Sequence, residues 1–383
     1  VEVRVLQKMS DMKSWTTIDV IKACRFCWMC RHVCTVGSMT AYETDTPRGK
    51  MLSLYGKLME MDIPDSEISQ TMYKCCLCYR CLEECVGGFD VPEVVLNTRA
   101  ELVEEGEYPK SLDGVRRLLS ETGVIDGRGC KVSKEDVESI VGRLPDKAPV
   151  VLFAGSSTVT YTPQAVLGAA KILKSAGIDF TMLDHPASSA YEFYEMGFRT
   201  DAVRVASETA GALNQICDSS SERPVVITLD PSDNWALTSL YQQWGIETSF
   251  DAIDFSSYVH NLLKTGRLNL GHADVVVTYH DPCHLGRVQR VFTQPREVLK
   301  SIEGLSLEEM HWNSQQAHCC GGHLKSTDPT LAAQIARKRV DQIKETGVGK
   351  VVTACPKCCD SLNSPDDDIE VIHIAEFLAN YLK

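Results

Sequence analysis

The sequence CRFCWMCRHVC, residues 24–34, carries four cysteines at spacings of three, three and four residues. A second run, CCLCYRCLEEC at residues 75–85, repeats this spacing with Cys75, Cys78, Cys81 and Cys85. Three thiolates three residues apart can wrap a short loop around one face of a cuboidal cluster, whereas the fourth lies a helical turn further on and points elsewhere. The repeated pattern predicts that this part of the chain binds metal.

The spacing also predicts how the cysteines divide between two sites. In proteins with two iron–sulfur clusters, the fourth cysteine of such a run ligates the other cluster. We therefore expect two [4Fe–4S] cubane clusters. The expected ligands are Cys24, Cys27, Cys30 and Cys85 for cluster 1, and Cys75, Cys78, Cys81 and Cys34 for cluster 2. Zinc is the alternative metal, but eight thiolates exceed the four of one structural zinc site. Cys76 is spare in this scheme, and we expect a packed thiol there.

Composition narrows the class of protein and its location. The formal net charge of -13 argues against binding to nucleic acid, which needs a basic surface. No apolar run approaches the roughly 20 residues of a membrane helix, so we expect no transmembrane segment. The N-terminal VEVRVLQKMSDMK has no apolar core of the kind found in secretory signals. The odd count of 17 cysteines favours a reducing compartment. We expect a cytoplasmic protein, and peripheral docking on the inner face of the membrane stays open.

The segments around the second cysteine run predict helices. MLSLYGKLMEMD (residues 51–62) and VPEVVLNTRAELVEEGE (residues 91–107) have helical patterns, and TPRGK (residues 46–50) precedes the first. Here the chain resembles the helical ferredoxin domain of iron–sulfur subunits of glycolate, lactate and glycerol 3-phosphate dehydrogenases. Thr35 and Val86 depart from the family pattern, because proline normally follows each fourth cysteine there. We expect a helical ferredoxin domain over residues 1–112 and a helical linker over residues 113–146.

After LPDKAP, residues 144–149, short apolar runs alternate with helical patterns, as is typical of an α/β domain. Three cysteine motifs lie in the last third of the chain: HDPCHLGR (residues 280–287), HCCGGH (residues 318–323) and VVTACPKCC (residues 351–359). Open α/β sheets bind ligands at the carboxyl ends of their strands. We therefore expect these loops to converge on one site. Cys359 is interpreted as a bystander, and the isolated Cys130 and Cys217 as buried small side chains.

The α/β part contains an internal repeat. The passage from Val225 and the passage from Val351 share strand, turn, helix, strand and helix, which aligns Asp230-Pro231-Ser232-Asp233 with Cys355-Pro356-Lys357-Cys358. Gly155-Ser156 then stands where a first cysteine would be, and HPASS (residues 185–189) where a cysteine pair would be. The predicted fold is α+β and multidomain, with a ferredoxin domain and two tandem α/β modules. The module at residues 147–270 has lost its cysteines, whereas the module at residues 271–383 is intact. Convergence of two generic α/β units is the alternative.

At the last cysteine motifs the chain resembles the Cys-Cys-Gly (CCG) domain family of heterodisulfide reductase catalytic subunits and related iron–sulfur oxidoreductases. The matching residues are Cys283, Cys319, Cys320, Gly321, Cys355 and Cys358. The resemblance implies a noncubane [4Fe–4S] cluster with a bridging cysteine, and makes these five cysteines the expected catalytic centre. A four-thiolate zinc site with one free thiol is the rival. His280, His284, His318 and His323 lie nearby, and either hydrogen bonds to cluster sulfurs or simple packing explains them.

The expected function is electron transfer. No glycine-rich fingerprint for FAD or NAD follows a strand, and FAGSS at residues 153–157 lacks the required spacing. The resemblance therefore implies an oxidoreductase component that works with an FAD-containing dehydrogenase subunit of the 2-hydroxyacid or glycerol-phosphate type. Further electron-transfer subunits, a quinone or another carrier would stand at the far end.

Two other functions stay open at this point. One is a heterodisulfide or disulfide reductase catalytic subunit. Heterodisulfide reductases of this family carry two intact Cys-Cys-Gly motifs, however, and this chain has one. The other is a zinc-bearing assembly scaffold in which the cysteine-free module docks a partner.

Overall fold

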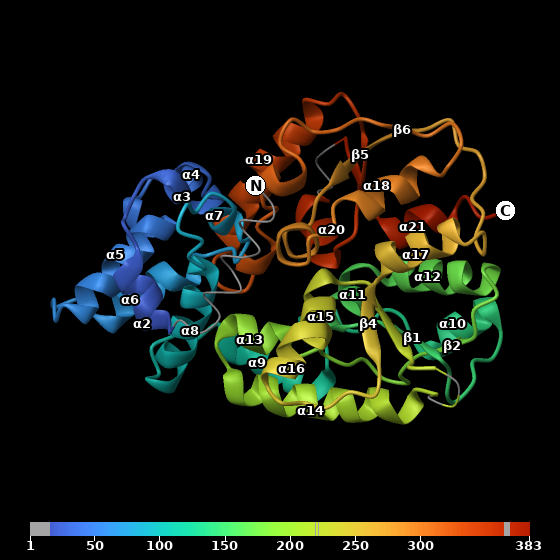
Figure 1. The fold of residues 1–383 in the computed structure, drawn as a ribbon, viewed down its shortest axis with the longest axis horizontal. Coiled ribbons are helices and arrows are strands. Elements are labelled where there is room, and N and C mark those ends of the chain that lie inside the picture. The colour runs from blue at the N-terminus through green and yellow to red at the C-terminus, as the bar shows by residue number, and fades with distance from the viewer. Residues whose placement is uncertain (1–15, 219, 221, 364–367) are drawn as a thin grey trace.

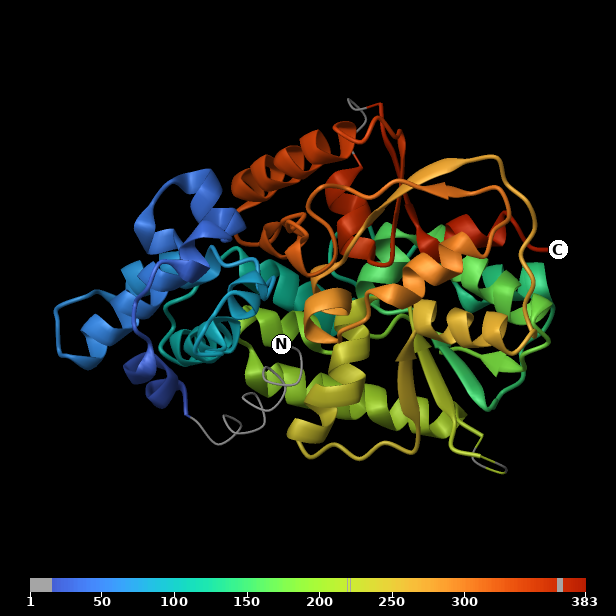
Figure 2. The same ribbon diagram turned by 45° about the horizontal axis from the view of Figure 1, so that its top comes forward.

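The computed structural model of the chain describes residues 16–218, 220, 222–363 and 368–383. A helical part formed by the N-terminal third lies against one end of an α/β part that contains two parallel sheets (Figures 1 and 2). The N-terminal stretch interpreted as lacking a secretory signal lies outside the described residues. No helix of the described residues combines the length and the apolar character needed to cross a bilayer.

The helical part carries both N-terminal cysteine runs in the loops and short helices between longer helices. Its elements are α2 (Thr17–Ala23), α3 (Met29–His32), α4 (Thr35–Thr40), η1 (Glu43–Asp45), α5 (Pro47–Leu58), α6 (Asp65–Tyr73), α7 (Arg80–Glu83) and α8 (Val91–Glu104). Helices α5 and α8 confirm the two predicted helices that flank the second run. TPRGK starts α5, because the Thr46 hydroxyl accepts the Gly49 N–H at 3.0 Å. A Cβ at Gly49 would lie 2.0 Å from the Glu43 carbonyl oxygen, so only glycine allows this approach.

Two helices, α9 (Leu112–Thr122) and α10 (Lys134–Val141), connect the helical part to the first sheet. That sheet has the order β2-β1-β3-β4, and all neighbouring strands are parallel. Its elements are β1 (Val150–Phe153), α11 (Ser156–Tyr161), α12 (Pro163–Ser175), β2 (Phe180–Thr181), α13 (Tyr191–Met196), α14 (Arg199–Ile216), β3 (Val225–Thr228), α15 (Pro231–Trp235), η2 (Ala236–Leu240), α16 (Tyr241–Gln243), β4 (Asp251–Asp254) and α17 (Phe255–Lys264).

The second sheet repeats this arrangement with the order β6-β5-β7-β8, again with parallel neighbours. Its elements are β5 (Val276–His280), η3 (His284–Val288), α18 (Thr293–Lys300), β6 (Ser306–Leu307), η4 (Ser314–Gln316), η5 (Gly322–Leu324), α19 (Pro329–Lys344), β7 (Lys350–Thr353), α20 (Pro356–Leu362), β8 (Glu370–His373) and α21 (Ile374–Ala379). In each sheet the strand order reverses between the two central strands. Crevices for ligands in α/β sheets form at such a point.

The two sheets share one apolar core. Leu152 of β1 and Val277 of β5 belong to the same buried cluster, to which Val137 of α10 also contributes. Helices α12 and α21 pack so closely that a Cβ at Gly168 would lie 2.5 Å from the Ala375 carbonyl oxygen. Side chains on both sides of residue 270 thus form a single interior, and the domain boundaries stay predictions.

Two expectations about single cysteines met different outcomes. Cys217 is buried, as expected, at the end of α14. Cys130 is exposed, so its interpretation as a buried side chain is wrong. Cys130 lies in the loop between α9 and α10, where its thiol donates to the Val132 carbonyl oxygen at 3.0 Å.

Candidate iron–sulfur sites

The predicted ligands of cluster 1 lie together in the helical part. Burial, together with the neighbouring thiols of Cys85, Cys24 and Cys27, raises the pKa of the Cys30 thiol to about 12. Cys27 is exposed, whereas the other three are half-buried. The structure therefore brings the end of the second cysteine run next to the first run.

The predicted ligands of cluster 2 line one cavity. Cys34 comes from the first run, and Cys75, Cys78 and Cys81 from the second. Burial raises the pKa of Cys34 to about 12, and the Cys78 and Cys75 thiols raise it as well. Thiols in such a setting remain protonated unless a cation binds them. The four convergent sulfurs around a cavity fit a metal cluster.

The two cysteine loops share one unusual backbone feature. Phe26 and Leu77 occupy equivalent positions between the first two cysteines of their runs, with positive φ angles of 50° and 49°. Such a backbone is costly for residues other than glycine and persists where the surroundings demand it. Backbone N–H groups also point at the sulfurs: Leu77 donates to Cys75 at 3.4 Å, and Phe89 donates to Cys85 at 3.3 Å. Hydrogen bonds to sulfur set the potential of iron–sulfur clusters.

The five cysteines of the CCG motif converge at the second sheet. Cys283 follows β5, Cys355 and Cys358 follow β7, and Cys319 and Cys320 come from the loop before α19. All five are buried. The Cys320 and Cys358 sulfurs lie 3.3 Å apart, and Cys319 forms hydrogen bonds with Cys283 and Cys320. The site occupies the point where the strand order of the second sheet reverses, as expected from the motifs.

The three cysteine groups form a continuous series. Cys30 is close enough to Cys81 to raise the pKa of that thiol, which links the first group to the second. A hydrogen bond from Cys319 lowers the pKa of Cys78 to about 6, which links the second group to the CCG cysteines. Cys76, expected to be a packed thiol, is buried and contacts Cys319.

Three buried cations surround the CCG cysteines, and the sequence did not reveal them. Arg287 lies beside Cys283 and Cys319, Arg339 beside Cys320 and Cys358, and Lys357 beside Cys355. Each cation is at most 3% exposed and keeps a nitrogen without a hydrogen-bond partner. Buried donors are normally satisfied. The orphaned nitrogens and the crowded thiols fit an anionic group bound at this site.

Arg287 also ties two cysteine groups together. Its Nε donates to the Cys78 carbonyl oxygen at 2.6 Å, and a terminal nitrogen donates to the Ala317 carbonyl oxygen at 2.8 Å. The first contact holds the loop of cluster 2, and the second holds the loop that leads to Cys319. One guanidinium group therefore fixes the two loops against each other.

The four histidines have different roles. His323 is hydrogen-bonded to Cys283 and paired with Glu195, and the nearby cations lower the pKa of Glu195 to about 2 although its burial acts in the opposite direction. His280 contacts Cys320 and accepts a hydrogen bond from Arg339 at 3.1 Å. His284 instead contacts Ser232 and the Leu77 carbonyl oxygen, each within 3.1 Å. His318 stacks on Trp312 and bonds to Gln342, which matches the packing alternative.

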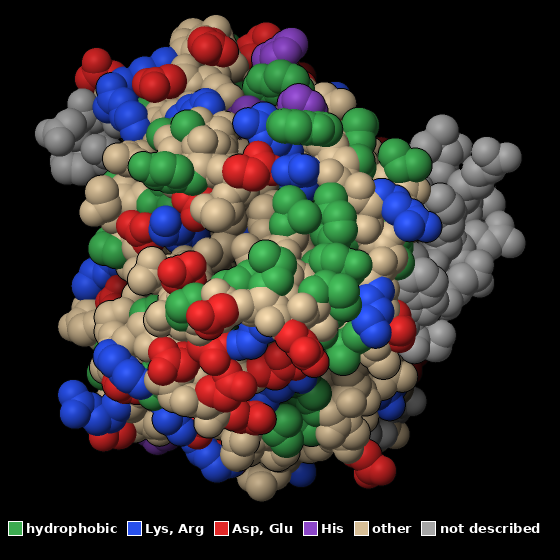
Figure 3. Space-filling view, turned by 90° about the vertical axis from the view of Figure 1, so that its left-hand side faces the viewer, with side chains coloured by type: hydrophobic (Ala, Val, Ile, Leu, Met, Phe, Trp, Pro, Cys, Tyr) green, Lys and Arg blue, Asp and Glu red, His purple; other side chains and the backbone are tan. Residues whose placement is uncertain are grey.

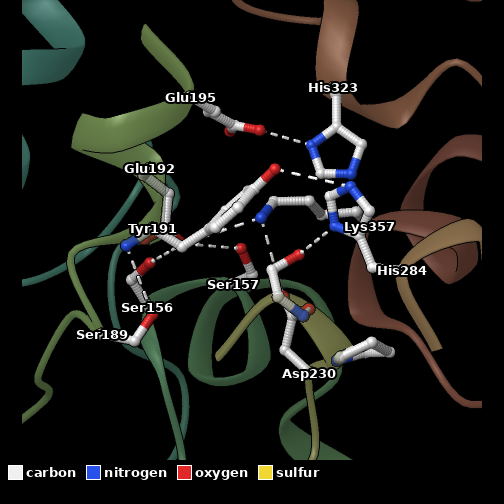
Figure 4. A network of polar contacts seen from close by, with 12 residues as sticks. Ser156, Ser157, Ser189, Tyr191, Glu192, Glu195, Asp230, His284, His323 and Lys357 are labelled. Carbon is white, nitrogen blue, oxygen red and sulfur yellow. Dashed lines mark hydrogen bonds and ion pairs between the residues drawn. The ribbon is translucent and has the colours of Figure 1, made fainter. Parts of the chain in front are cut away.

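A buried polar network of serines and carboxylates from the first sheet surrounds the Lys357 side chain (Figure 4). The hydroxyls of Ser156 and Ser157 donate to the Glu192 carboxylate at 2.7 and 3.2 Å. The Lys357 ammonium reaches into the network from α20, 3.8 Å from Glu192 and 3.7 Å from Asp230. The first sheet thus presents serines and carboxylates where the second sheet presents cysteines.

Comparison with known proteins identifies the second sheet region. A family model described as a cysteine-rich domain, CCG, matches residues 277–363. These residues form a CCG domain. The chain is 27% identical to a fumarate reductase (CoM/CoB) subunit of Methanothermobacter marburgensis, over 98% of this chain and 75% of that protein. It is 25% identical to a dihydromethanophenazine:CoB–CoM heterodisulfide reductase subunit of Methanosarcina acetivorans, over 97% of both chains.

The CCG match and these relatives confirm the resemblance drawn from the cysteine motifs. The chain is homologous to proteins named as oxidoreductase components, among them the heterodisulfide reductase subunit from Methanosarcina acetivorans. A crystal structure of a hypothetical protein from Helicobacter pylori shares the fold, with a TM-score of 0.57 and 8% identity over 98% of this chain and 76% of that one. Both relatives are named as subunits, so partner subunits are consistent with these findings.

Proposed function

We propose that the chain is an iron–sulfur electron-transfer subunit with two cubane clusters and one CCG cluster. The main support for this proposal is that the three cysteine groups form a continuous series. Cys30 lies near Cys81, and Cys78 lies near Cys319. Cys24, Cys27, Cys30 and Cys85 would hold cluster 1, and Cys75, Cys78, Cys81 and Cys34 cluster 2. Cys283, Cys319, Cys320, Cys355 and Cys358 would hold a noncubane [4Fe–4S] cluster. Bound clusters would supply one-electron redox chemistry.

The residues of the chain prepare these sites for electron transfer. Burial keeps water away from the CCG cysteines, and N–H groups donate to sulfur, as Gly321 does to Cys319 at 3.3 Å. Fixed cations favour added negative charge in a poorly polarisable interior. Arg287 serves both sites, because it lies beside Cys78 as well as Cys283. These features favour reduction of the CCG centre by electrons that arrive from cluster 2.

The α/β part is proposed to be two copies of one module. Strand register supports this, because Phe153 pairs with Thr228 in the first sheet and His280 pairs with Thr353 in the second. Counting onward from those pairs aligns Ser156 with Cys283.

The turns of the two copies also match in conformation. Ala190, after a serine pair, has a φ of 71°, and Gly321, after the cysteine pair, has a φ of 80°. We propose the divisions 1–112 for the ferredoxin domain, 113–146 for the linker, 147–270 for the degenerate copy and 271–383 for the intact copy.

A partner is proposed to meet the chain at cluster 1. Cys27 is the one exposed cysteine among the thirteen proposed ligands. Exposed apolar side chains lie nearby in sequence, including Trp28, Met29 and Val86. Figure 3 views this end of the molecule and shows apolar side chains gathered across its middle. An FAD-containing dehydrogenase subunit is the partner we propose here, with a quinone or another carrier as the second redox partner.

Metal analysis of the anaerobically purified chain tests the proposal. We expect about 12 iron atoms with matching acid-labile sulfide and no zinc, together with EPR signals from three centres. About 8 iron atoms and one zinc would refute the CCG cluster and make that site structural. If all three centres are present, the reduced flavoprotein partner should reduce cluster 1 first, then cluster 2 and finally the CCG cluster.

Disulfide reduction is a second candidate, favoured by one observation. The Methanosarcina acetivorans relative, named as part of a heterodisulfide reductase, aligns over 97% of both chains. One observation argues against this function. Only the proposed second copy of the module carries the five cysteines, whereas the proposed first copy carries serines and carboxylates at the corresponding positions. Incubation of the isolated chain with reduced viologen and a disulfide separates the two candidates. Thiol release at a catalytic rate would establish the reductase, whereas no release is expected of an electron-transfer subunit.

A further inference from the structure

The carboxylates of the first sheet stand where the second sheet carries cysteines. Asp230 and Asp233 follow β3 as Cys355 and Cys358 follow β7. Both aspartates are at most 1% exposed, and the Oδ2 atom of each lacks a hydrogen-bond partner. A buried carboxylate oxygen without a hydrogen-bond partner is unfavourable unless it binds a proton or a water molecule. This inference rests on the proposed function, because it assigns these residues a role toward the CCG centre.

The surroundings of Asp233 form a built site. A Cβ at Gly155 would lie 2.0 Å from Asp233 Oδ2, so glycine makes room for this carboxylate at the end of β1. Ser189 donates a hydrogen bond to it from the loop before α13. The other charged or titratable groups that face it are Asp230 beside α15, Glu192 of α13, Tyr241 of α16 and Lys357 of α20.

Lys357 forms ion pairs with two of these carboxylates but not with Asp233. Its ammonium, which is 3% exposed and lacks a hydrogen-bond partner, lies 3.7 Å from Asp230 and 3.8 Å from Glu192. Figure 4 shows this side chain extended toward both. Among the described residues, no cation comes within ion-pair distance of Asp233. Burial raises the pKa of Asp233 well above its usual range and the Asp230 and Glu192 carboxylates raise it further, whereas the Ser189 hydrogen bond and the Lys357 ammonium act in the opposite direction.

Lys357 also connects these carboxylates to the CCG centre. It stands between Cys355 and Cys358 in sequence and interacts electrostatically with Cys355. A charge that appears at the CCG cysteines therefore acts on the same buried ammonium that balances Asp230 and Glu192. In a poorly polarisable interior such interactions reach beyond direct contact. Added negative charge at the centre favours a proton at Asp233, the carboxylate for which no ion pair is found among the described residues.

We propose that Asp233 is a proton-uptake site that binds one proton from solvent when the CCG centre accepts one electron. The electron comes from the neighbouring cluster 2, and the only bond formed is the O–H bond on the Asp233 carboxylate. Oxidation of the centre releases the same proton. The degenerate copy would thereby let the chain exchange electrons with carriers that also take up protons, such as a quinone or a disulfide.

The test is an anaerobic EPR-monitored redox titration of the iron-loaded full chain, with dithionite as reductant, from about pH 6 to about pH 9. In the wild type, the midpoint potential of the CCG centre should fall as pH rises, by up to about 59 mV per pH unit for one proton per electron. The Asp233→Asn side chain keeps the shape of aspartate and an oxygen that can accept a hydrogen bond from Ser189, but it cannot bind a proton in this pH range. The midpoint potential of the CCG centre in this variant should therefore not vary with pH. Asp251→Asn changes an exposed carboxylate of β4 and should retain the wild-type slope.

The outcomes separate this inference from the proposed function. Without any CCG signal in the wild type, the proposed function fails. A signal with a pH-independent potential, or a slope that survives in Asp233→Asn, overturns the proton-uptake site alone. If Asp233→Asn does not retain its iron, redox difference infrared spectra of the wild type decide the question. They should gain a protonated-carboxyl band on reduction, and its absence would overturn the proposal.

Discussion

Replacement of Arg287 by methionine is expected to lower the midpoint potential of the CCG centre and to loosen its link to cluster 2. The guanidinium group is buried beside Cys78, Cys283 and Cys319. Methionine fills a similar volume with an uncharged chain. Arginine does not lose its proton in proteins, so the effect reports a fixed charge and not a titration.

The size of the effect follows from the contacts of Arg287. Hydrogen bonds to charged groups contribute about 1.5–3 kcal/mol, and about 1.4 kcal/mol corresponds to about 59 mV for one electron. We therefore expect the potential to fall by roughly 60–130 mV. The Cys78 and Ala317 carbonyl oxygens also lose their donor, at a cost of about 1–3 kcal/mol each where they stay buried. Faster loss of iron from the CCG site should accompany the shift.

EPR-monitored redox titration at one fixed pH measures the potential, and iron analysis verifies that the clusters are present. Arg287→Lys keeps the positive charge and should retain most of the wild-type potential. Arg204→Met removes an exposed arginine of α14 and should have no effect. If Arg287→Met holds its full iron content at the wild-type potential, the buried cation does not stabilise the reduced centre, and the electrostatic argument is wrong.

Three further substitutions test the ligand assignments. Cys320→Ser should abolish the CCG EPR signal and leave about 8 iron atoms in the two cubane clusters; retention of the signal would exclude Cys320 as a ligand. Gly321→Ala places a Cβ 2.9 Å from the Ala332 carbonyl oxygen at a φ of 80°, so it should selectively lower CCG iron, which metal analysis would detect. Cys76→Ser should keep all of the roughly 12 iron atoms, and loss of a cluster would make this buried thiol a ligand.

The sequence predicted those parts of the fold that depend on local spacing. Helices α5 and α8 follow from their apolar periodicity, and the parallel strands follow from short apolar runs between helices. The apolar runs did not show how long each strand would be, because β2 has only two residues. Apolar runs of this kind pack as well in loops as in strands, and the neighbouring strand decides how far pairing extends.

The charged residues around the CCG site could not be predicted, because their role depends on folding. Arg287 lies within a quoted motif and Lys357 between two cysteines, yet lone basic residues are usually exposed. Tertiary structure buries both and places Asp230 and Glu192 of the other sheet beside Lys357.

The repeat alignment already placed acidic residues at the positions that correspond to two CCG cysteines. It placed Asp230 over Cys355 and Asp233 over Cys358 but explained the acidic residues only as lost cysteines. Neutral residues would have closed the site at less energetic cost, since buried charges are expensive unless paired. Four carboxylates at most 8% exposed, on Glu192, Glu195, Asp230 and Asp233, together with a lysine from the intact copy, therefore indicate that the degenerate copy contributes charge to the CCG centre.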